Sequence, residues 1–152
     1  MSNKVFTVKN SEDLSSHLFG LFEQNKKGAT VIFLSGDLGA GKTTFVQSFS
    51  KTLDVKSRVL SPTFNILKEH SIEAVEKGFR KMVHIDLYRI EHVGHRELES
   101  FGVNEYLLDS SVIMFVEWPE RIEENVLTPN YWVNILIQND GSRQITIKEY
   151  ES

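Results

Sequence analysis

The sequence predicts a three-layer α/β fold with a mixed, mostly parallel β-sheet, helices on both faces and a C-terminal antiparallel hairpin. Three observations predict it. Continuous apolar runs at 30–34 and 111–116 are typical of strands buried on both faces of a parallel sheet. A glycine-rich loop joins the first run to a helical pattern at 43–53. Near the C-terminus, two partly alternating segments enclose a turn sequence.

The N-terminal part of the chain predicts a strand at 4–8 and then a helix. Asn10 and Ser11 precede acidic residues, as at a helix start. The apolar residues of this helix recur at helical spacing and form one core-facing stripe: Leu14, Leu18, Leu21 and Phe22. The helix expected at 43–53 has the same pattern at Phe45, Val46, Phe49 and Leu53.

The middle of the chain predicts a hairpin followed by helical structure. Residues 64–70 and 81–88 have the composition of strands, and the polar stretch 73–80 separates them. Helical residues are expected at 93–109, with an interruption at Gly102.

The last part of the chain predicts one buried strand and the terminal hairpin. The apolar run 111–116 is followed directly by an acid, Glu117. Segments 131–138 and 144–150 flank the sequence Asn-Asp-Gly-Ser at 139–142, which favours a tight turn.

Composition narrows the possible functions. With 152 residues, 40% of them hydrophobic and 25% charged, we expect a single domain over residues 1–152. The absence of cysteine excludes disulfide and thiolate chemistry. A net charge of −4 argues against gripping a nucleic-acid backbone by bulk electrostatics. No stretch approaches the roughly 20 apolar residues of a membrane span, and no signal-peptide pattern is present, so we expect a cytoplasmic location without membrane contact.

The loop at 36–43 reads Gly-Asp-Leu-Gly-Ala-Gly-Lys-Thr, a full match to the phosphate-binding pattern GxxxxGK[ST]. Its glycines permit conformations in which successive backbone N–H groups bind phosphate oxygens. Lys42 would contact the outer phosphates, Thr43 would ligate Mg²⁺, and Thr44 would lie near the α-phosphate. A chance match is expected in about one chain of this length in a hundred or fewer. The sequence therefore predicts a P-loop NTPase-like fold.

Two acids that follow predicted strands are candidates to complete a magnesium site. We assign Glu117 to the metal and Asp86 to orienting the attacking water or to a position behind the metal ligands, and the reverse stays open. Strand alternation places His84 on the face of Asp86. A structural alternative for Asp86 is a buried ion pair with Arg80 or Arg89.

Four blocks of sequence together resemble the TsaE family, also called YjeE, the P-loop ATPases of bacterial tRNA threonylcarbamoyladenosine biosynthesis. The blocks are GDLGAGKTT at 36–44, SPTF at 61–64, HIDLYR at 84–89 and VEWPE at 116–120. Their order and spacing make the resemblance specific, and it extends over almost the whole chain.

The resemblance implies a set of site residues for ATP and Mg²⁺. Those expected around the phosphates are Gly39, Ala40, Gly41, Lys42, Thr43 and Thr44. Thr43 and Glu117 would hold Mg²⁺, with Asp86 and Lys42 as catalytic residues. Thr63 would belong to a nucleotide-responsive loop, Ser11 would approach the adenine, and Trp118 would contact the nucleotide or a partner, with a core position as the alternative.

The resemblance also implies partners. The chain would act with TsaD and TsaB, which transfer the threonylcarbamoyl group to an adenosine beside the anticodon, and it would meet tRNA only through that complex.

Other classes of protein share the phosphate loop. A GTPase usually carries Asn-Lys-x-Asp, and the nearest match, at 25–28, lacks the acid. A small-molecule kinase needs an arginine-rich lid, but Arg89, Arg96 and Arg121 are not clustered. A nucleotide-sensing adaptor without significant hydrolysis stays open, because no arginine is in an evident finger position. We therefore expect slow hydrolysis by the isolated protein and a site completed by partners.

Overall fold

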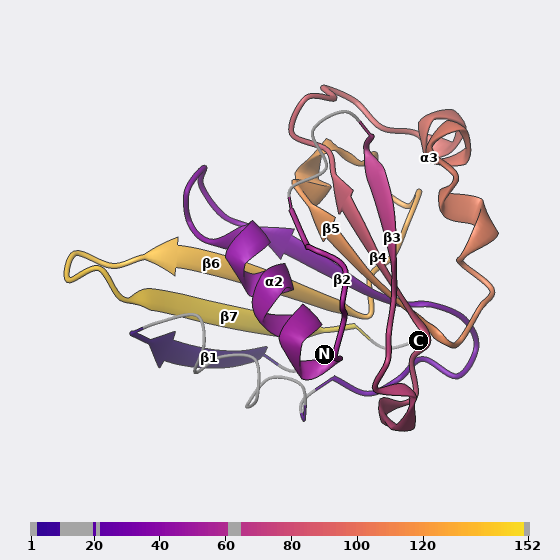
Figure 1. The fold of residues 1–152 in the computed structure, drawn as a ribbon. Helices are drawn as coiled ribbons and strands as arrows, with labels where there is room; N and C mark the ends of the chain where they lie inside the picture. Colours follow the sequence, from indigo (N-terminus) through magenta and orange to yellow (C-terminus); the bar gives the residue numbers. More distant parts are fainter. Residues whose placement is uncertain (1–2, 10–19, 21, 61–64, 151–152) are drawn as a thin grey trace.

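The computed structural model describes residues 3–9, 20, 22–60 and 65–150 (Figure 1). Most of the predicted first helix, with Ser11, and the loop at 61–64, with Thr63, lie outside the described residues. In the part of the chain that is described, no helix is long and apolar enough to cross a membrane.

A seven-stranded sheet forms the centre of the fold. Its strands in chain order are β1 Asn3–Val8, β2 Thr30–Ser35, β3 Leu67–Ser71, β4 Lys81–Asp86, β5 Val112–Glu117, β6 Tyr131–Ile137 and β7 Arg143–Glu149. The spatial order is β1-β7-β6-β2-β5-β4-β3. The four strands β6, β2, β5 and β4 are mutually parallel. β3 pairs antiparallel with β4, β7 with β6, and β1 with β7. The predicted mixed sheet with a C-terminal antiparallel hairpin is confirmed.

Helices cover both faces of this sheet. Helix α2, Lys42–Thr52, lies over one face, with β1, β7 and β6 fanned out to one side of it and β5, β4 and β3 to the other (Figure 1). Helix α3, His95–Phe101, and the 3-10 helix Val103–Glu105 pack on the opposite face. Since each face has its own apolar cluster, the three-layer arrangement is confirmed.

Aromatic side chains dominate the core beneath α2. Phe49 is fully buried, and its ring lies 5.4 Å from Phe22, 5.2 Å from Phe45 and 5.4 Å from Phe115. Phe22 comes from the segment before β2, Phe45 and Phe49 come from α2, and Phe115 comes from β5. This cluster therefore fixes α2 against the centre of the sheet, and with it the loop that precedes the helix.

Several element boundaries differ from the predictions, and the helical structure expected at 93–109 is limited to α3 and the 3-10 helix Val103–Glu105. β4 ends at Asp86 and not at 88, because the Asp86 side chain accepts a hydrogen bond from the backbone N–H of Tyr88 and turns the chain out of the sheet. β3 begins only at Leu67, within the predicted 64–70. The interruption at Gly102 is confirmed: this glycine has a φ of 88° and ends α3 in the left-handed conformation.

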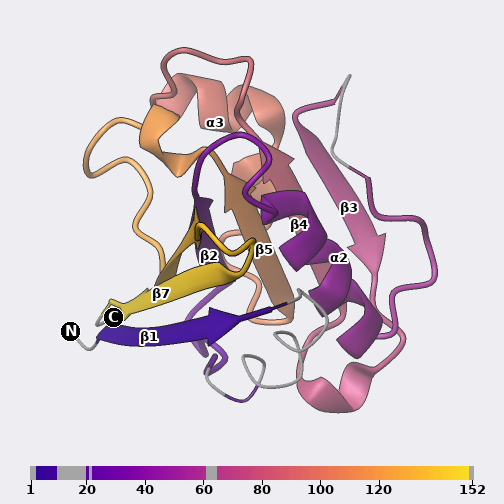
Figure 2. The same cartoon turned by 90° about the vertical axis from the view of Figure 1, so that its left-hand side faces the viewer.

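The chain ends of the described residues lie side by side. β1 pairs with β7 from Asn3 opposite Lys148 to Val8 opposite Arg143, and Figure 2 shows the two strands running together. The turn predicted at 139–142 joins β6 to β7, with Gly141 at a φ of 85°. The hairpin extends the sheet beside the phosphate loop.

Phe49→Ala should lower the free energy of unfolding by about 3–5 kcal/mol, because it removes a buried ring and leaves a cavity between α2 and the sheet. Urea denaturation measures the change. Val75→Ala, at a side chain that is 56% exposed, is the control and should stay within about 0.5 kcal/mol of the wild type. A loss below about 1 kcal/mol in Phe49→Ala would contradict this packing.

Candidate active site

The phosphate loop connects the end of β2 to the start of α2 and has a glycine wherever φ is positive. Gly36, Gly39 and Gly41 have φ values of 151°, 83° and 108°. A Cβ on Gly36 would lie 2.6 Å from the carbonyl oxygen of Ile135 in β6, so this glycine is needed for space as well as for conformation. The loop therefore sits directly against the neighbouring parallel strand.

Lys42, the first residue of α2, folds back over its own loop. Its Nζ donates to the carbonyl oxygen of Gly36 at 2.5 Å and to that of Asp37 at 3.4 Å. The ammonium also lies 3.8 Å from the ring centroid of Trp118, a cation–π contact. The positive charge is thus held at the mouth of the phosphate loop, where the motif predicts it.

Four carboxylates surround this ammonium. Burial lowers the pKa of Lys42, and the nearby charges of Glu117, Glu120, Asp86 and Asp37 oppose that shift. One lysine among four acids makes the region rich in negative charge. Such a surrounding favours an additional cation, which fits a site for metal-bound phosphates.

Glu117 ends β5 and is buried, with only 2% of its surface exposed. The hydroxyl of Thr43 lies 3.0 Å from both of its carboxylate oxygens. His84 Nε2 lies 2.5 Å from the Oε2 oxygen of the same carboxylate. The predicted metal pair Thr43 and Glu117 is therefore brought together, and a histidine is added behind it.

Asp86 lies beside Glu117 in the sheet. The two residues are paired in register between the parallel strands β4 and β5 and have side chains on the same face. Asp86 is half-buried and lines the same cavity as Thr43 and Glu117, so it is not a core carboxylate. Its position in the wall suits a group that acts on a ligand in that cavity.

A cavity of about 310 Å³ opens where these elements meet. The residues that line it are Leu38, Gly39, Gly41, Lys42, Thr43, Thr44, Asp86, Tyr88, Glu117 and Trp118. Trp118 is half-buried, has a left-handed backbone with φ 60°, and packs its ring 5.1 Å from that of Tyr88. All the predicted site residues that are described line this cavity except Ala40. Ala40 belongs to the phosphate loop, but its side chain is buried in the core.

The oxygen atoms in this wall suit a Mg²⁺ ion that takes only a few of its ligands from the protein. Hydroxyl and carboxylate oxygens are the ligands that Mg²⁺ prefers. Within the described ranges, no group of three or more His, Asp or Glu side chains is placed to hold a metal by itself. This donor set suits an ion held largely by phosphate oxygens and water, as in nucleotide sites.

Comparisons with known proteins agree on one family. The family model described as "Threonylcarbamoyl adenosine biosynthesis protein TsaE" matches residues 8–145. The "tRNA threonylcarbamoyladenosine biosynthesis protein TsaE" of Bacillus subtilis is 38% identical over 120 residues, covering 79% of this chain and 70% of that protein. A protein of the same name from Nostoc is 32% identical over 152 residues, covering 97% and 86%. These matches confirm the resemblance indicated by the four sequence blocks.

A solved structure gives the same result for the fold. The crystal structure of Bacillus subtilis YdiB superposes with a TM-score of 0.71 at 28% sequence identity, covering 99% of this chain and 87% of that one.

Sequence reasoning missed one residue beside the site, Arg143. It starts β7, and its Nε donates to the carbonyl oxygen of Ala40 at 3.0 Å while Nη1 donates to that of Gly141 at 2.5 Å. The guanidinium thus ties the terminal hairpin to the phosphate loop. Only its position directly after the predicted turn could have drawn attention to it, because the pairing of the hairpin with the loop is a long-range contact.

Arg143→Gln should weaken nucleotide binding about fivefold, since a charge-assisted hydrogen bond that holds the loop is worth roughly 1 kcal/mol or more when partly exposed. Calorimetric titration with ADP measures the affinity. Lys148→Gln removes the same charge from the same strand, at a side chain that lies over Tyr150, and should bind as the wild type does. Equal weakening in both variants would show that net charge is responsible, and would reject the bracing role.

Proposed function

The chain belongs to the TsaE family, and from this premise we propose that it is an ATP-binding and ATP-hydrolysing subunit of tRNA threonylcarbamoyladenosine biosynthesis. One observation supports the proposal above all. The phosphate loop after β2, Glu117 at the end of β5 and Asp86 at the end of β4 meet at one cavity. The carboxyl ends of parallel strands are where α/β folds bind their ligands.

Each residue in the cavity wall has a role in binding. The backbone N–H groups of residues 39–44 and the positive end of α2 would bind the phosphate oxygens of ATP. Lys42 would exchange its carbonyl contacts for the outer phosphates. Thr43 would ligate Mg²⁺ and Glu117 would hold its water shell. When bound, Mg²⁺ supplies charge that offsets the developing negative charge on the phosphates.

Hydrolysis would require one water molecule beside the γ-phosphate of the bound ATP. The water oxygen attacks the γ-phosphorus, the bond from that phosphorus to the bridging oxygen of ADP breaks, and ADP and inorganic phosphate leave. Asp86 would orient this water, since it lies beside Glu117 in the cavity wall. Among the described residues, none that lines the cavity is an arginine, so Lys42 and a bound metal would supply the positive charge near the transferring group. Hydrolysis by the isolated chain should therefore be slow.

TsaD and TsaB are the partners that we propose. They would perform the threonylcarbamoyl transfer in the cytoplasm, and this chain would contact tRNA only through them. The net charge of −4 supports a subunit that docks on protein, because direct tRNA binding calls for a basic face.

A nucleotide-sensing adaptor is the second candidate. Lys42 and Thr43 are engaged with the loop carbonyls and with Glu117, so any nucleotide must rearrange these contacts whether or not it is hydrolysed. A small-molecule kinase is less favoured, because the described cavity wall lacks the arginines that clamp a transferring phosphate.

Asp86→Asn should bind ATP normally and lose hydrolysis by about 100-fold, since it removes the group that orients water.

Lys42→Ala should weaken ATP binding at least tenfold, because a charged contact worth roughly 1.5–3 kcal/mol is lost. Phosphate release, measured with and without TsaD and TsaB, tests both variants. Glu76→Gln, at an exposed acid outside the cavity wall, is the control and should match the wild type.

The same assay separates the three classes. Phosphate release that rises with TsaD and TsaB supports the ATPase. Tight ATP binding without release under either condition would favour the sensor, and transfer of the γ-phosphate to a small molecule would favour the kinase. Unchanged release by a stable Asp86→Asn would contradict the role of Asp86.

A further inference from the structure

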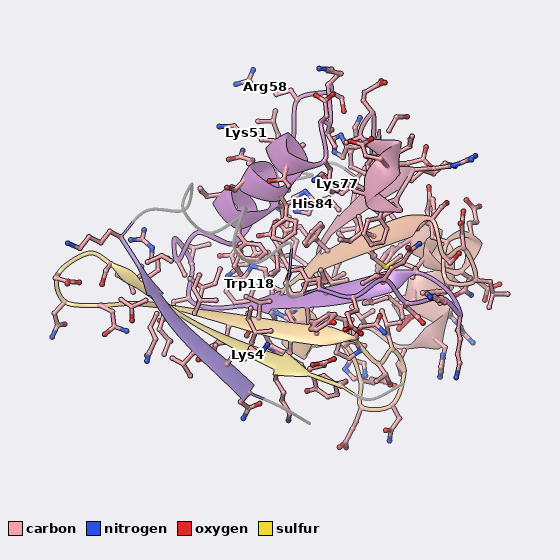
Figure 3. All side chains as sticks on the ribbon, turned by 90° about the horizontal axis from the view of Figure 1, so that it is seen from below. Lys4, Lys51, Arg58, Lys77, His84 and Trp118 are labelled. Carbon is pink, nitrogen blue, oxygen red and sulfur yellow. The ribbon has the colours of Figure 1, made fainter. Side chains whose placement is uncertain are left out.

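The proposed mechanism does not use His84, which is a buried ionisable residue. This residue lies in β4 with none of its surface exposed. Figure 3 shows it inside the molecule between α2 and the sheet, whereas Lys51 and Arg58 point outward. A buried imidazole is costly unless its nitrogens are satisfied, so its partner should explain its presence.

That partner is Glu117. Because an ionised carboxylate can only accept hydrogen bonds, we assign the proton to His84 Nε2, which donates to Glu117 Oε2 at 2.5 Å. Nδ1 has no hydrogen-bond partner among the described residues. One ring nitrogen of His84 thus has no hydrogen bond, while the other bonds to Glu117. This pattern indicates that the bond to the carboxylate is the reason for a histidine at this position.

Thr43 and His84 contact the Glu117 carboxylate differently, because Thr43 lies near both oxygens and His84 bonds to one. The Thr43 hydroxyl has one proton and lies 3.0 Å from both Glu117 oxygens, so it can serve only one of them fully. Because the hydroxyl oxygen also has lone pairs, Thr43 can ligate a metal while its proton stays on one of the Glu117 oxygens. The bond from His84 involves Oε2 alone, so it does not depend on Thr43 and leaves Oε1 without a contact to the histidine.

We propose that His84 is a positioning residue that holds Glu117 Oε2 so that Oε1 stays directed at the magnesium site beside Thr43. This inference rests on the proposed function, since it assigns a purpose to the carboxylate of that site. Groups that orient metal-binding side chains in this way commonly change metal affinity 10–100-fold when removed.

His70 provides a comparison within the same face of the sheet. It is also buried, with 2% of its surface exposed, and lies opposite Met82, two residues before His84 on β4. Its Nδ1 bonds to Ser57 Oγ at 2.6 Å, and its Nε2 has no partner among the described residues. His70 thus resembles His84 in burial, but its bond goes to Ser57 and not to a residue of the cavity wall, so it separates a packing role from a metal-positioning role.

The test measures binding of a non-hydrolysable ATP analogue by calorimetry over a series of Mg²⁺ concentrations. In His84→Gln the amide nitrogen takes the place of Nε2 and keeps the bond to Glu117, whereas in His84→Asn the amide nitrogen takes the place of Nδ1 and cannot reach it. His70→Asn is the matched control for burial. Thermal unfolding of each variant establishes that it is folded.

We expect His84→Asn to need about 10–100-fold more Mg²⁺ than the wild type for half-maximal enhancement of analogue binding. His84→Gln and His70→Asn should stay within about threefold of the wild type, and binding without Mg²⁺ should be equal in all four proteins. An unchanged Mg²⁺ requirement in His84→Asn would overturn the inference and leave the proposed function intact. Equal weakening with and without Mg²⁺ would also overturn it. A wild type whose binding ignores Mg²⁺ would reject the metal site itself.

Discussion

The hydrogen bond between the Thr43 hydroxyl and the buried Glu117 carboxylate is the constraint on which the site depends. It joins the first turn of α2 to the carboxyl end of β5, two elements that are 74 residues apart in the chain. The apolar layers on both faces of the sheet bring these ends together and leave the carboxylate buried at the wall of the cavity. A buried acid with two neighbouring donors is stable there.

The charges around this bond form one arrangement. Lys42 lies among acids that include Asp86 and Glu117, and its ammonium is shared between the loop carbonyls and the Trp118 ring. Arg143 holds the other side of the phosphate loop from β7. A polyphosphate with its metal matches both signs of charge in this wall, which is why a nucleotide fits it better than a simple anion or a simple cation does.

Much of this fold could be predicted from the sequence, because local patterns determine it: the apolar runs of β2 and β5, the glycine loop and the turn at 139–142. The grouping of Lys42, Thr43, Asp86 and Glu117 followed from the rule that parallel strands end at one edge. The bonds of His84 to Glu117 and of Arg143 to Ala40 could not be predicted, since each depends on side-chain directions between distant segments. The end of β4 at Asp86 was missed because a side-chain turn competed with an apolar pattern.

We propose that Thr43 and Glu117 form a metal site that His84 keeps aligned. A crystal structure with Mg²⁺ and a non-hydrolysable ATP analogue tests it most directly. We expect the Thr43 oxygen on the metal, Glu117 Oε1 on a water of the metal, and His84 Nε2 still bonded to Oε2. A metal held away from Thr43, with the bond from Thr43 to Glu117 intact, would contradict it.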